Sequence, residues 1–473
     1  MTATYRSIFS PRRGLFCILL SGLILGGCAS ASQQRETLRA LSIQTGVRME
    51  SYAERPSREV ADTLRVLLEQ PLTSQAAVQV AVLNSPHFQA LLQDLGIARA
   101  DLRQGRLLPN PTLDLAIRGE GAGEKDYEYA LMEDLKGVLL YPLQRGMANA
   151  QYTQAKAHLA DELLAGIEEV KAHFFALQGS LQDYSLLQTI LQTAEAGAAL
   201  AERQHQAGNI NALELAAHQA LLHETRLALT QAEAAVQIER EVLGRLLGLG
   251  EGDWQIAEEL PHLPSADPSL PELEQTALSQ RPDLEAARAE IRVMAQVRKL
   301  ARFSRVPSLH LGVSTQKEEV RRTIGPAVEL EIPLFGQGQA AIARARAQQG
   351  QSQHRLRALE AEVRSQVRIS FAQMELARQR AQLYQEALLP LRTQVVAETQ
   401  KHYNYMLLGV YQLLQARRDE VAARQAHIAA LKDYWVARSQ LERAIGGPLS
   451  PSEGRPPAEG ENSPSPPSHP HSH

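Results

Sequence analysis

The sequence predicts a mainly helical protein with a small β part, built from two similar halves. Pro86 and Pro282 each begin a helical run, and Pro111 and Pro307 each end one; both pairs are 196 residues apart. Near-constant spacing of this kind indicates an internal duplication. Residues 143–260 contain no proline, which favours long helices. The short runs after Pro111 and Pro307 alternate apolar and polar residues, which is typical of β-strands with one apolar face.

The composition and the missing motifs argue against a nucleic-acid-binding protein and against an enzyme. The chain has 473 residues, a formal net charge of −4 and only 5% aromatic residues. No Lys- and Arg-rich stripe with interleaved aromatics occurs, so we expect no nucleic-acid partner. The metalloprotease, nucleophile-elbow and phosphate-loop motifs are also missing, so the sequence predicts a protein that is not an enzyme and needs no cofactor.

Residues 1–27 have the pattern of a signal peptide. Arg12 and Arg13 precede an apolar run over residues 14–25, which is too short to span a bilayer. The run ends in Leu-Gly-Gly-Cys, which resembles a bacterial lipobox and makes Cys28 the lipid-modified (palmitate-bearing) first residue of the mature lipoprotein. Ala29 implies, by resemblance to bacterial lipoproteins, sorting to the outer membrane. An ordinary signal peptide and a membrane-spanning helix are the alternatives.

The next elements follow in chain order. Residues 28–72 are interpreted as a lipid-anchored N-terminal tether, irregular apart from an amphipathic stretch. The first structural repeat, residues 73–262, begins with Thr73 and Ser74 as an N-cap. The expected elements after this cap are a helix through residue 83, a helix over 86–107, a strand over 112–118, a glycine-rich turn over 119–123 and a poorly alternating strand over 127–141.

A long helical hairpin completes the first repeat. Its first helix, residues 143–205, would reach on the order of 95 Å at about 1.5 Å per residue. Residues 208–211 break this helix, and a return helix follows from 212 to about 246.

The second structural repeat, residues 263–447, has the same order of elements. Tyr141-Pro142-Leu143 and Ile332-Pro333-Leu334 are expected to correspond in the two repeats, and Pro390 is expected to kink the second long helix. The tail, residues 448–473, is rich in Pro, Ser and His and is expected to be disordered. The predicted elements of this repeat are strands over 308–314 and 327–332, a helix over 339–401, a break over 404–409 and a return helix over 411–445.

These elements predict an assembly. Helices of about 60 residues that double back on themselves cannot fold into a compact globule. Four strands cannot close a barrel, and an open sheet edge is not tolerated in hydrocarbon. Transmembrane barrels begin at about eight strands, so several copies must combine their strands if one face meets lipid. The expected object is an oligomeric tube, with a short β-barrel at one end and a long helical section at the other.

The sequence resembles the TolC family of outer-membrane efflux channels over about residues 73–447. The resemblance rests on the order of elements, the duplicated Pro-x-Leu-x-Leu entry to the strands, the Ile-Pro-Leu-Phe-Gly run at residues 332–336 and the segment over 403–410 at the helical turn. It implies a homotrimer whose four strands per subunit form a 12-stranded transmembrane barrel in the outer membrane of a Gram-negative bacterium, above a periplasmic α-barrel. It also implies a passive exit duct of a tripartite efflux pump, which docks onto a periplasmic adaptor (membrane-fusion) protein and serves an inner-membrane pump.

Pore-lining residues are predicted on the polar face of the alternating strands. These residues are Asp114, Arg118, His310, Glu329 and Glu331. They would form a wet wall that permits passage without specific binding. The alternative is the ordinary solvent face of a sheet in a soluble protein.

The two helical breaks are the predicted adaptor-docking tips. Exposed apolar residues at the second tip would be unusual unless a partner covers them, and the alternative is that they pack inside the turn. The tips are Gly208, Asn209, Ile210 and Asn211 in the first repeat, and Met406, Leu407, Leu408 and Gly409 in the second.

The gate is predicted near the second tip. Relatives commonly carry acids spaced three apart there, whereas this chain has Gln412 and Gln415, and Glu214 holds the place of Gln412 in the first repeat. This departure from the family pattern puts a cation-selecting carboxylate ring in question. Inter-helix hydrogen bonds would keep the mouth shut, or these side chains would merely face solvent. The further gate candidates are Tyr403, Tyr405, Arg418 and Asp419.

No resident metal site is predicted. His469, His471 and His473 are the weak candidates, because imidazoles on a flexible tail bind Zn²⁺, Cu²⁺ or Ni²⁺ only weakly. The histidine tail and the second tip, which looks like metal-resistance relatives, favour metal ions over drugs as exported cargo. The alternative to a channel is a lipid-anchored periplasmic helical scaffold or adaptor without its own pore.

Overall fold

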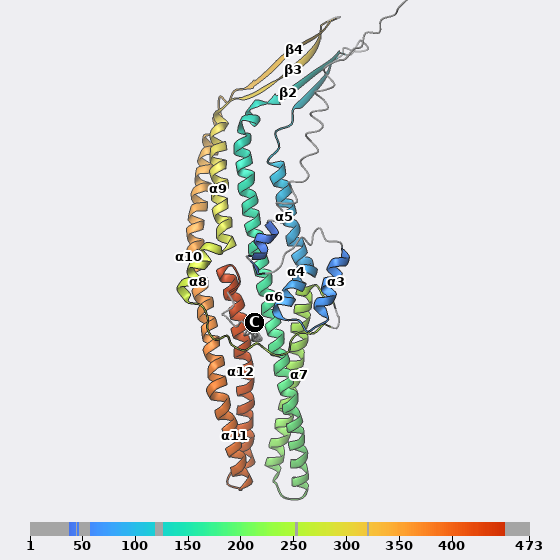
Figure 1. The fold of residues 1–473 in the computed structure, drawn as a ribbon, viewed down its shortest axis with the longest axis vertical. Coiled ribbons are helices and arrows are strands. Elements are labelled where there is room, and N and C mark those ends of the chain that lie inside the picture. The colour runs from blue at the N-terminus through green and yellow to red at the C-terminus, as the bar shows by residue number, and fades with distance from the viewer. Residues whose placement is uncertain are drawn as a thin grey trace, which may run out of the picture.

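The fold is an elongated body with a β-sheet at one end and two helical hairpins at the other (Figure 1). The computed structural model describes residues 37–43, 45–46, 57–118, 126–250, 254–318 and 321–449. The signal segment, Cys28, the turn over residues 119–123 and the tail from residue 450 lie outside the described residues. The predicted mainly helical class with a small β part is confirmed.

The elements of the two repeats follow one another in the same order. The first set is α3 (Ser57–Leu68), α4 (Ser74–Asn84), α5 (Pro86–Gln104), β1 (Thr112–Arg118), β2 (Asp126–Asp134), α6 (Leu135–Gln206) and α7 (Ala212–Leu247). The second set is α8 (Leu270–Gln280), α9 (Pro282–Arg302), the 3₁₀ turn η2 (Phe303–Arg305), β3 (Ser308–Glu318), β4 (Arg321–Glu331), α10 (Gln339–Leu383), the π-helical turn η3 (Tyr384–Leu388), α11 (Leu389–Asn404) and α12 (Val410–Ile445).

Local sequence explains where these helices begin. Thr73 caps α4 as predicted, because its side chain accepts a hydrogen bond from the backbone N–H of Ala76. Pro86 and Pro282 occupy the first turns of α5 and α9, where a missing N–H costs nothing. Asn211 caps α7 by accepting from the N–H of Glu214 at 2.9 Å.

The duplication extends to tertiary contacts. Gly248 ends α7 and Gly446 ends α12, and both adopt left-handed backbone conformations, with φ of 70° and 85°. Each glycine lies against the start of a helix from its own repeat, Gly248 against Ser85 and Gly446 against Arg281. A Cβ at either position would approach backbone atoms within 3 Å, so only glycine fits without a shift.

The strand predicted over residues 127–141 ends earlier than expected. The strand stops at Asp134, and α6 begins at Leu135 with Pro142 inside its second turn. The side chain of Asp134 starts this helix by accepting from the N–H of Lys136 at 3.0 Å. Pro142 therefore lies in a helix, whereas Pro333 lies in the loop between β4 and α10, and the two motifs are not structural equivalents.

The first long helix is consequently longer than predicted. It has 72 residues, which correspond to about 110 Å at about 1.5 Å per residue. In the second repeat, Pro390 interrupts the helix as expected, and the interruption takes the form of the π-helical turn η3 directly before it. Across the described ranges, no helix combines the length and apolar character that a membrane crossing requires.

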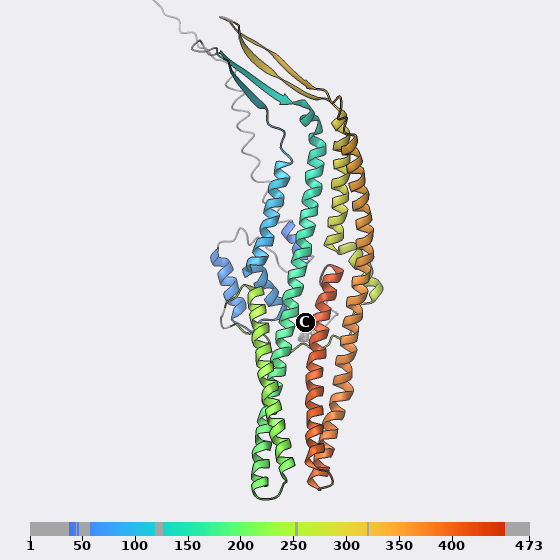
Figure 2. The ribbon, with the colours of Figure 1, turned by 180° about the vertical axis from the view of Figure 1, so that it is seen from behind.

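The two hairpins lie side by side, with their tips at the same end of the molecule (Figures 1 and 2). In the lower part of the body, α6 pairs with α7 and α11 pairs with α12, while α12 also contacts α6. Trp435 on α12 joins the two halves, because it stacks on Phe175 of α6 with ring centroids 5.3 Å apart and contacts the apolar cores of both repeats.

The segment before the first repeat is more ordered than a simple tether. Residues 37–43 are helical, and Leu38 and Leu41 are 7% and 2% exposed in the core of the first repeat. Leu64 and Leu68 of α3 pack against the same core. Apolar residues at three- and four-residue spacing in this segment therefore bury against α4 and its neighbours rather than remaining in solvent.

The sheet joins the strands of both repeats in the order β1-β2-β3-β4, with every neighbouring pair antiparallel. The central pairing places β2 of the first repeat beside β3 of the second, with Leu131 opposite Val313. Gly312 lies so close to the backbone carbonyl of Leu131 that it has no room for a side chain. Strands β1 and β4 form the two edges of the sheet.

Candidate functional site

One face of the sheet is apolar and exposed. The backbone register places Leu113, Leu131 and Val313 in one row across three strands, and Leu311 opposite Val328 in β3 and β4. A soluble monomer seldom exposes a continuous apolar area of this kind, so a hydrophobic environment is expected to cover it. The members of this apolar face are Leu113, Leu115, Ile117, Tyr127, Tyr129, Leu131, Leu311, Val313, Ile324, Val328 and Leu330, all exposed.

The opposite face of the sheet is polar, and it brings the predicted pore-lining residues together. His310 lies directly opposite Glu329, and on its other side the register pairs it with Asp134. Glu331 pairs with Ser308, and Asp114 starts a row that continues through Ala130 and Ser314. Arg118 pairs with Asp126 at the end of β1. Strand residues two apart share a face, so all five predicted residues belong to this polar face.

Polar contacts connect the two hairpins near their lower ends. Nη2 of Arg418 on α12 donates to Oε2 of Glu224 on α7 at 2.8 Å. Nε2 of Gln425 on α12 donates to Oδ1 of Asp183 on α6 at 2.9 Å. Since α6 and α7 form one hairpin and α12 belongs to the other, these two contacts hold the hairpins together. They are candidate latches for the mouth.

A second set of contacts lies within the α11–α12 hairpin. Asp419 accepts from Nη1 of Arg392 at 2.8 Å and from Nε2 of Gln415 at 2.9 Å. In the described part of the chain, no side-chain hydrogen bond joins Tyr403 or Tyr405 to Arg418 or Asp419. The exposed Gln412 and the half-buried Glu214 lie in the first turns of α12 and α7.

Glu420 is the one buried carboxylate of this region among the described residues, with a side chain 9% exposed. Burial alone would raise its pKa, but the hydrogen bond and charge of Arg424, with help from Arg417 and Thr393, outweigh burial and lower the pKa. Glu420 is therefore ionised and fixes three side chains of α11 and α12. Glu224 and Asp183 could not be identified from the sequence, because their partners lie on another helix. Glu420 was also missed, although Arg417 and Arg424 lie on its own helix.

The two tips share a backbone conformation but differ in chemistry. Both close with a left-handed residue, Gly208 at φ 76° and Met406 at φ 57°, which is unusual for a residue with a side chain. The backbone hydrogen bonds also correspond, with Asn209 bonded to Gln204 and Leu407 bonded to His402. At these bonds the two turns share the helix-ending geometry of a Schellman motif.

The second tip is exposed and apolar. Tyr405 is 77% exposed, Met406 93% and Leu407 67%, so the interpretation that these side chains pack inside the turn is wrong. The helix after this tip begins at Gly409 without a side-chain cap, whereas Asn211 caps the corresponding helix of the first repeat. A strained turn, a missing cap and exposed apolar side chains do not stabilise the monomer, so this tip is a candidate surface for a partner.

The remaining histidines form no metal centre in the described ranges. No group of three or more His, Cys, Asp or Glu side chains there could hold a metal ion. Burial lowers the pKa of both His218 and His427, which keeps these two side chains neutral. His469, His471 and His473 lie outside the described residues.

Comparisons with known proteins agree with this architecture. Residues 273–447 match the family described as outer membrane efflux protein. The search of curated proteins returns no match for this chain.

Solved structures match most of the chain. A membrane protein from Pseudomonas aeruginosa has a TM-score of 0.68 and 21% identity, covering 79% of this chain and 93% of its own. CusC has a TM-score of 0.67 and 19% identity, covering 79% and 92%. The Campylobacter jejuni outer membrane channel CmeC has a TM-score of 0.68 and 16% identity, covering 79% and 85%.

These identities are low, so the structural matches establish the shared fold, and the family match supplies the class of protein. The exposed apolar face, the polar face behind it and the long helical hairpins are the parts that such a channel needs. Residues 273–447 therefore match the outer membrane efflux protein family, and most of the chain shares the fold of solved outer-membrane channels.

Proposed function

We propose that three copies of this chain close a 12-stranded barrel in the outer membrane and act together as the passive exit duct of a tripartite efflux pump. The observation that carries the proposal is the sheet, which is apolar and exposed on one face, polar on the other and open at both edges. Unpaired strand edges are costly in hydrocarbon, so an isolated subunit cannot insert.

The strand directions are compatible with closure. Because all neighbouring strands are antiparallel in the order β1-β2-β3-β4, β1 and β4 run in opposite directions. Pairing β4 of one copy with β1 of the next therefore continues the antiparallel pattern around a ring. The apolar face would meet lipid, and Asp114, His310, Glu329 and Glu331 would face the lumen.

Neighbouring residues on opposite faces of β3 test this orientation. Arg in place of Val313 would put a charge into lipid, at a cost of about 2–4 kcal/mol near the bilayer midplane, whereas Arg in place of Ser314 would point into water. We expect Val313→Arg to abolish the heat-modifiable trimer in outer-membrane fractions and Ser314→Arg to keep it. Equal behaviour of the two variants would refute the barrel orientation.

The lipid anchor and the pump partners complete the proposal. Cys28 is proposed to carry the lipid, and Cys28→Ser should leave the protein unlabelled by radioactive palmitate while a wild-type control is labelled. The helical tips are proposed to dock a periplasmic adaptor protein that serves an inner-membrane pump. The exposed residues Met406 and Leu407 favour the second tip as the larger contact.

A photo-reactive amino acid at Leu407 tests the docking, with Leu376 on α10, far from both tips, as control, since both are exposed leucines. An adduct identified as a membrane-fusion adaptor at Leu407 only would support the proposal. Equal labelling at both positions would contradict it. The cargo is proposed to be small molecules or metal ions, and gene deletion followed by a sensitivity screen against Cu²⁺, Zn²⁺, Co²⁺, dyes and antibiotics identifies which.

A further inference from the structure

A basic zone lies directly below the apolar face of the sheet. Residues 291–317 and residues 332–359, which flank the β3–β4 hairpin, contain no Asp or Glu. Residues 135–160, the start of α6, also lack acids. The ends of α6, α9 and α10 nearest the sheet therefore carry basic but no acidic side chains, although the whole chain has a net charge of −4.

Among the described residues, the basic side chains at the ends of α9 and α10 nearest the sheet have no acidic partner within ion-pair distance. We define the basic girdle as five exposed residues near the end of α9 and the start of α10, namely Lys299, Arg302, Arg305, Arg344 and Arg346. The nearest ion pair between α9 and α10 in the described part of the chain joins Arg355 to Glu290 at 4.0 Å. This pair lies farther from the sheet than the girdle.

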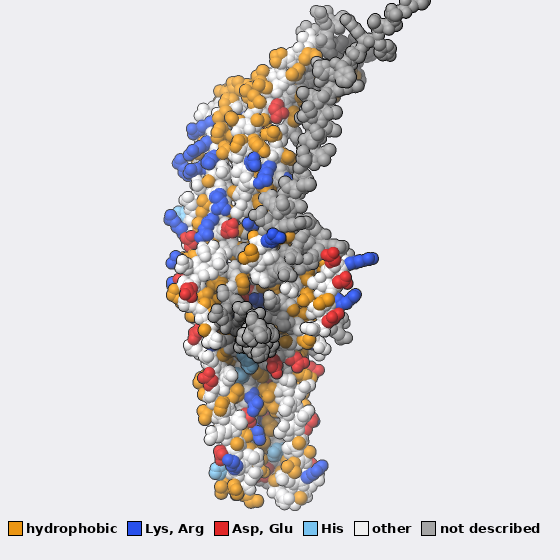
Figure 3. All heavy atoms as spheres, viewed as in Figure 1, with side chains coloured by type: hydrophobic (Ala, Val, Ile, Leu, Met, Phe, Trp, Pro, Cys, Tyr) orange, Lys and Arg blue, Asp and Glu red, His pale blue; other side chains and the backbone are white. Residues whose placement is uncertain are grey.

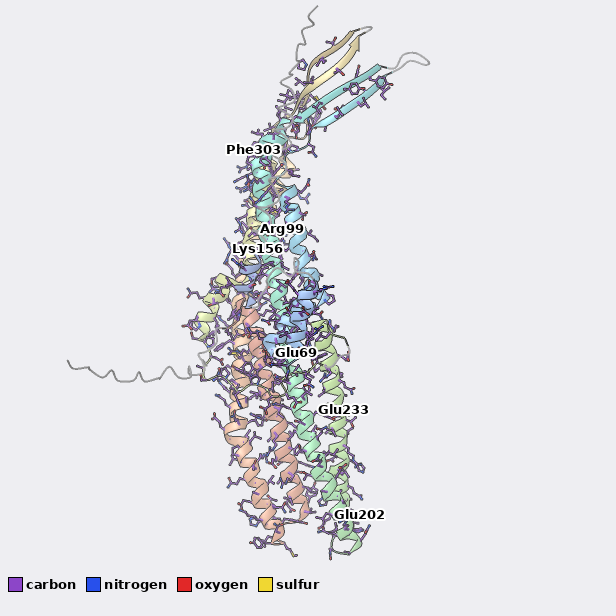
Figure 4. All side chains as sticks on the ribbon, turned by 45° about the vertical axis from the view of Figure 1, so that its right-hand side comes forward. Glu69, Arg99, Lys156, Glu202, Glu233 and Phe303 are labelled. Atoms are coloured by element: carbon purple, nitrogen blue, oxygen red, sulfur yellow. The ribbon has the colours of Figure 1, made fainter. Side chains whose placement is uncertain are left out.

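The girdle and the apolar face share one side of the molecule. Lys and Arg side chains gather over the upper ends of α9 and α10, immediately below the hydrophobic surface of β3 and β4 (Figure 3). Between them lie the exposed apolar residues Leu334, at 71%, and Phe335, at 98%. Phe303 marks the same junction in Figure 4, while Arg99 and Lys156 lie further down the helical section.

We propose that the basic girdle binds the head groups of anionic phospholipids in the periplasmic leaflet of the outer membrane. The inference rests on the proposed membrane orientation, in which the apolar face is in hydrocarbon and the helices extend into the periplasm. Phe335 and Leu334 then lie at the edge of the hydrocarbon, and the girdle lies at the level of the phosphates. Three copies would surround the channel with positive charge.

The chemistry favours phosphate over other partners. Arg presents a planar fork that matches phosphate oxygens, and four of the five girdle residues are Arg. Electrostatic attraction to an anionic surface acts within a Debye length of about 8–10 Å. The girdle residues of α10 lie about 8–10 Å along the helix from its start, at the end of the helix that is nearer to the sheet.

Phospholipid that is retained by the purified protein tests the proposal. The lipid-modified trimer is reconstituted into vesicles of equal parts phosphatidylethanolamine and phosphatidylglycerol, re-extracted in mild detergent and assayed for bound phospholipid by mass spectrometry. We expect enrichment of phosphatidylglycerol, which replacement of Arg302, Arg305, Arg344 and Arg346 by Gln lowers about fivefold. Replacement of the same residues by Lys should retain most of the enrichment.

The matched control removes the same charge elsewhere. It replaces four exposed arginines away from the sheet, Arg58, Arg65, Arg203 and Arg364, by Gln and should keep the enrichment. Equal loss in both variants, or no enrichment in the wild type, would overturn the proposal. Dissociation of the girdle variant into monomers without a change in bound lipid would show that the girdle contacts a second copy, which also overturns it.

The same preparations separate this inference from the proposed function. Conductance in planar bilayers and the heat-modifiable trimer report whether the channel exists. If both persist while phosphatidylglycerol binding is unaffected by the girdle, the lipid inference fails alone. If the wild type neither conducts nor forms the trimer, the proposed function fails.

Discussion

Arg418 and Glu224 are 194 residues apart in the chain, and their side chains meet at 2.8 Å between α12 and α7. The pair joins the two hairpins towards their lower ends, at the proposed mouth of the channel. The Glu224 side chain is 61% exposed, so the pair contributes little to global stability. We expect the pair to limit the distance between the hairpins and to have little effect on the free energy of unfolding.

We predict that Arg418→Ser increases the conductance of the reconstituted channel with little change in the melting temperature. The control is Arg226→Ser, which breaks a similar exposed pair with Glu195 at 3.0 Å inside the first hairpin. Tyr403→Phe should leave the conductance unchanged, because its hydroxyl makes no bond to the latch in the described structure. If the Arg418 and Arg226 variants conduct equally, the latch assignment is wrong.

Met406 provides a test of strain at the second tip. A side chain in the left-handed region costs about 1–2 kcal/mol, and glycine removes this cost. We predict that Met406→Gly slows hydrogen exchange of the amides in this turn and weakens adaptor binding. The corresponding substitution in the first repeat, Gly208→Ala, should speed exchange at its own tip, since φ there is 76°. Faster exchange in Met406→Gly would contradict the strain argument.

Gly446 provides a test of repeat packing. Gly446→Ala should lower the free energy of unfolding by about 2 kcal/mol or more, because the left-handed backbone and the approach of the Arg281 backbone both oppose a Cβ. Gly248→Ala should behave in the same way. Gly96→Ala is the control, since nothing lies within 4 Å of its position, and in a helix it should stabilise by about 0.5–1 kcal/mol. Urea unfolding of the solubilised protein measures all three.

The raised pKa of Tyr434 predicts that the free energy of unfolding decreases at high pH. Its hydroxyl donates to Asp267, which also accepts from Arg438 and Arg378. Burial is the main cause that raises the pKa of Tyr434 to about 12; the charge of Arg438 opposes the shift, and that of Asp267 adds to it. A pKa that is higher in the folded state means that the stabilisation is complete below pH 10 and is lost as the pH rises towards 12.

The variant Tyr434→Phe isolates this effect. Wild-type stability should fall by on the order of 2 kcal/mol more than that of the variant between pH 10 and pH 12. At neutral pH the variant should be about 1 kcal/mol less stable, because a hydrogen bond to a charged group is lost. Parallel curves for the two proteins across this range would show that the tyrosine does not titrate as described.

Much of the fold could be predicted from the sequence because its signals are local. The prolines at residues 86 and 282, the cap at Thr73 and the alternation in β1, β3 and β4 all act on their own element, and the structure confirms these elements. Pro142 does not mark the boundary between β2 and α6, because it lies inside the helix rather than at its start. The signal for the correct boundary was Asp134, a good N-cap residue.

The candidate sites were predictable only in part. Alternation gave the two faces of each strand, and exposure of Met406 and Leu407 agrees with a partner surface. The latch partners could not be found, because Glu224 and Asp183 lie on helices whose contacts with α12 depend on how the two hairpins pack. A charged residue on a long helix carries no sequence signal that names its partner on another helix.

The sequence by itself determined the repeated order of elements and the apolar alternation of the strands, since both depend on residues close together in the chain. Only the tertiary structure decided that β2 pairs with β3 across the two repeats, which aligns Leu131 with Val313 and makes one continuous apolar face. It also decided which side chains connect the hairpins. Strand register and helix packing are set by contacts between residues far apart in the chain, and such contacts arise only when the whole chain folds.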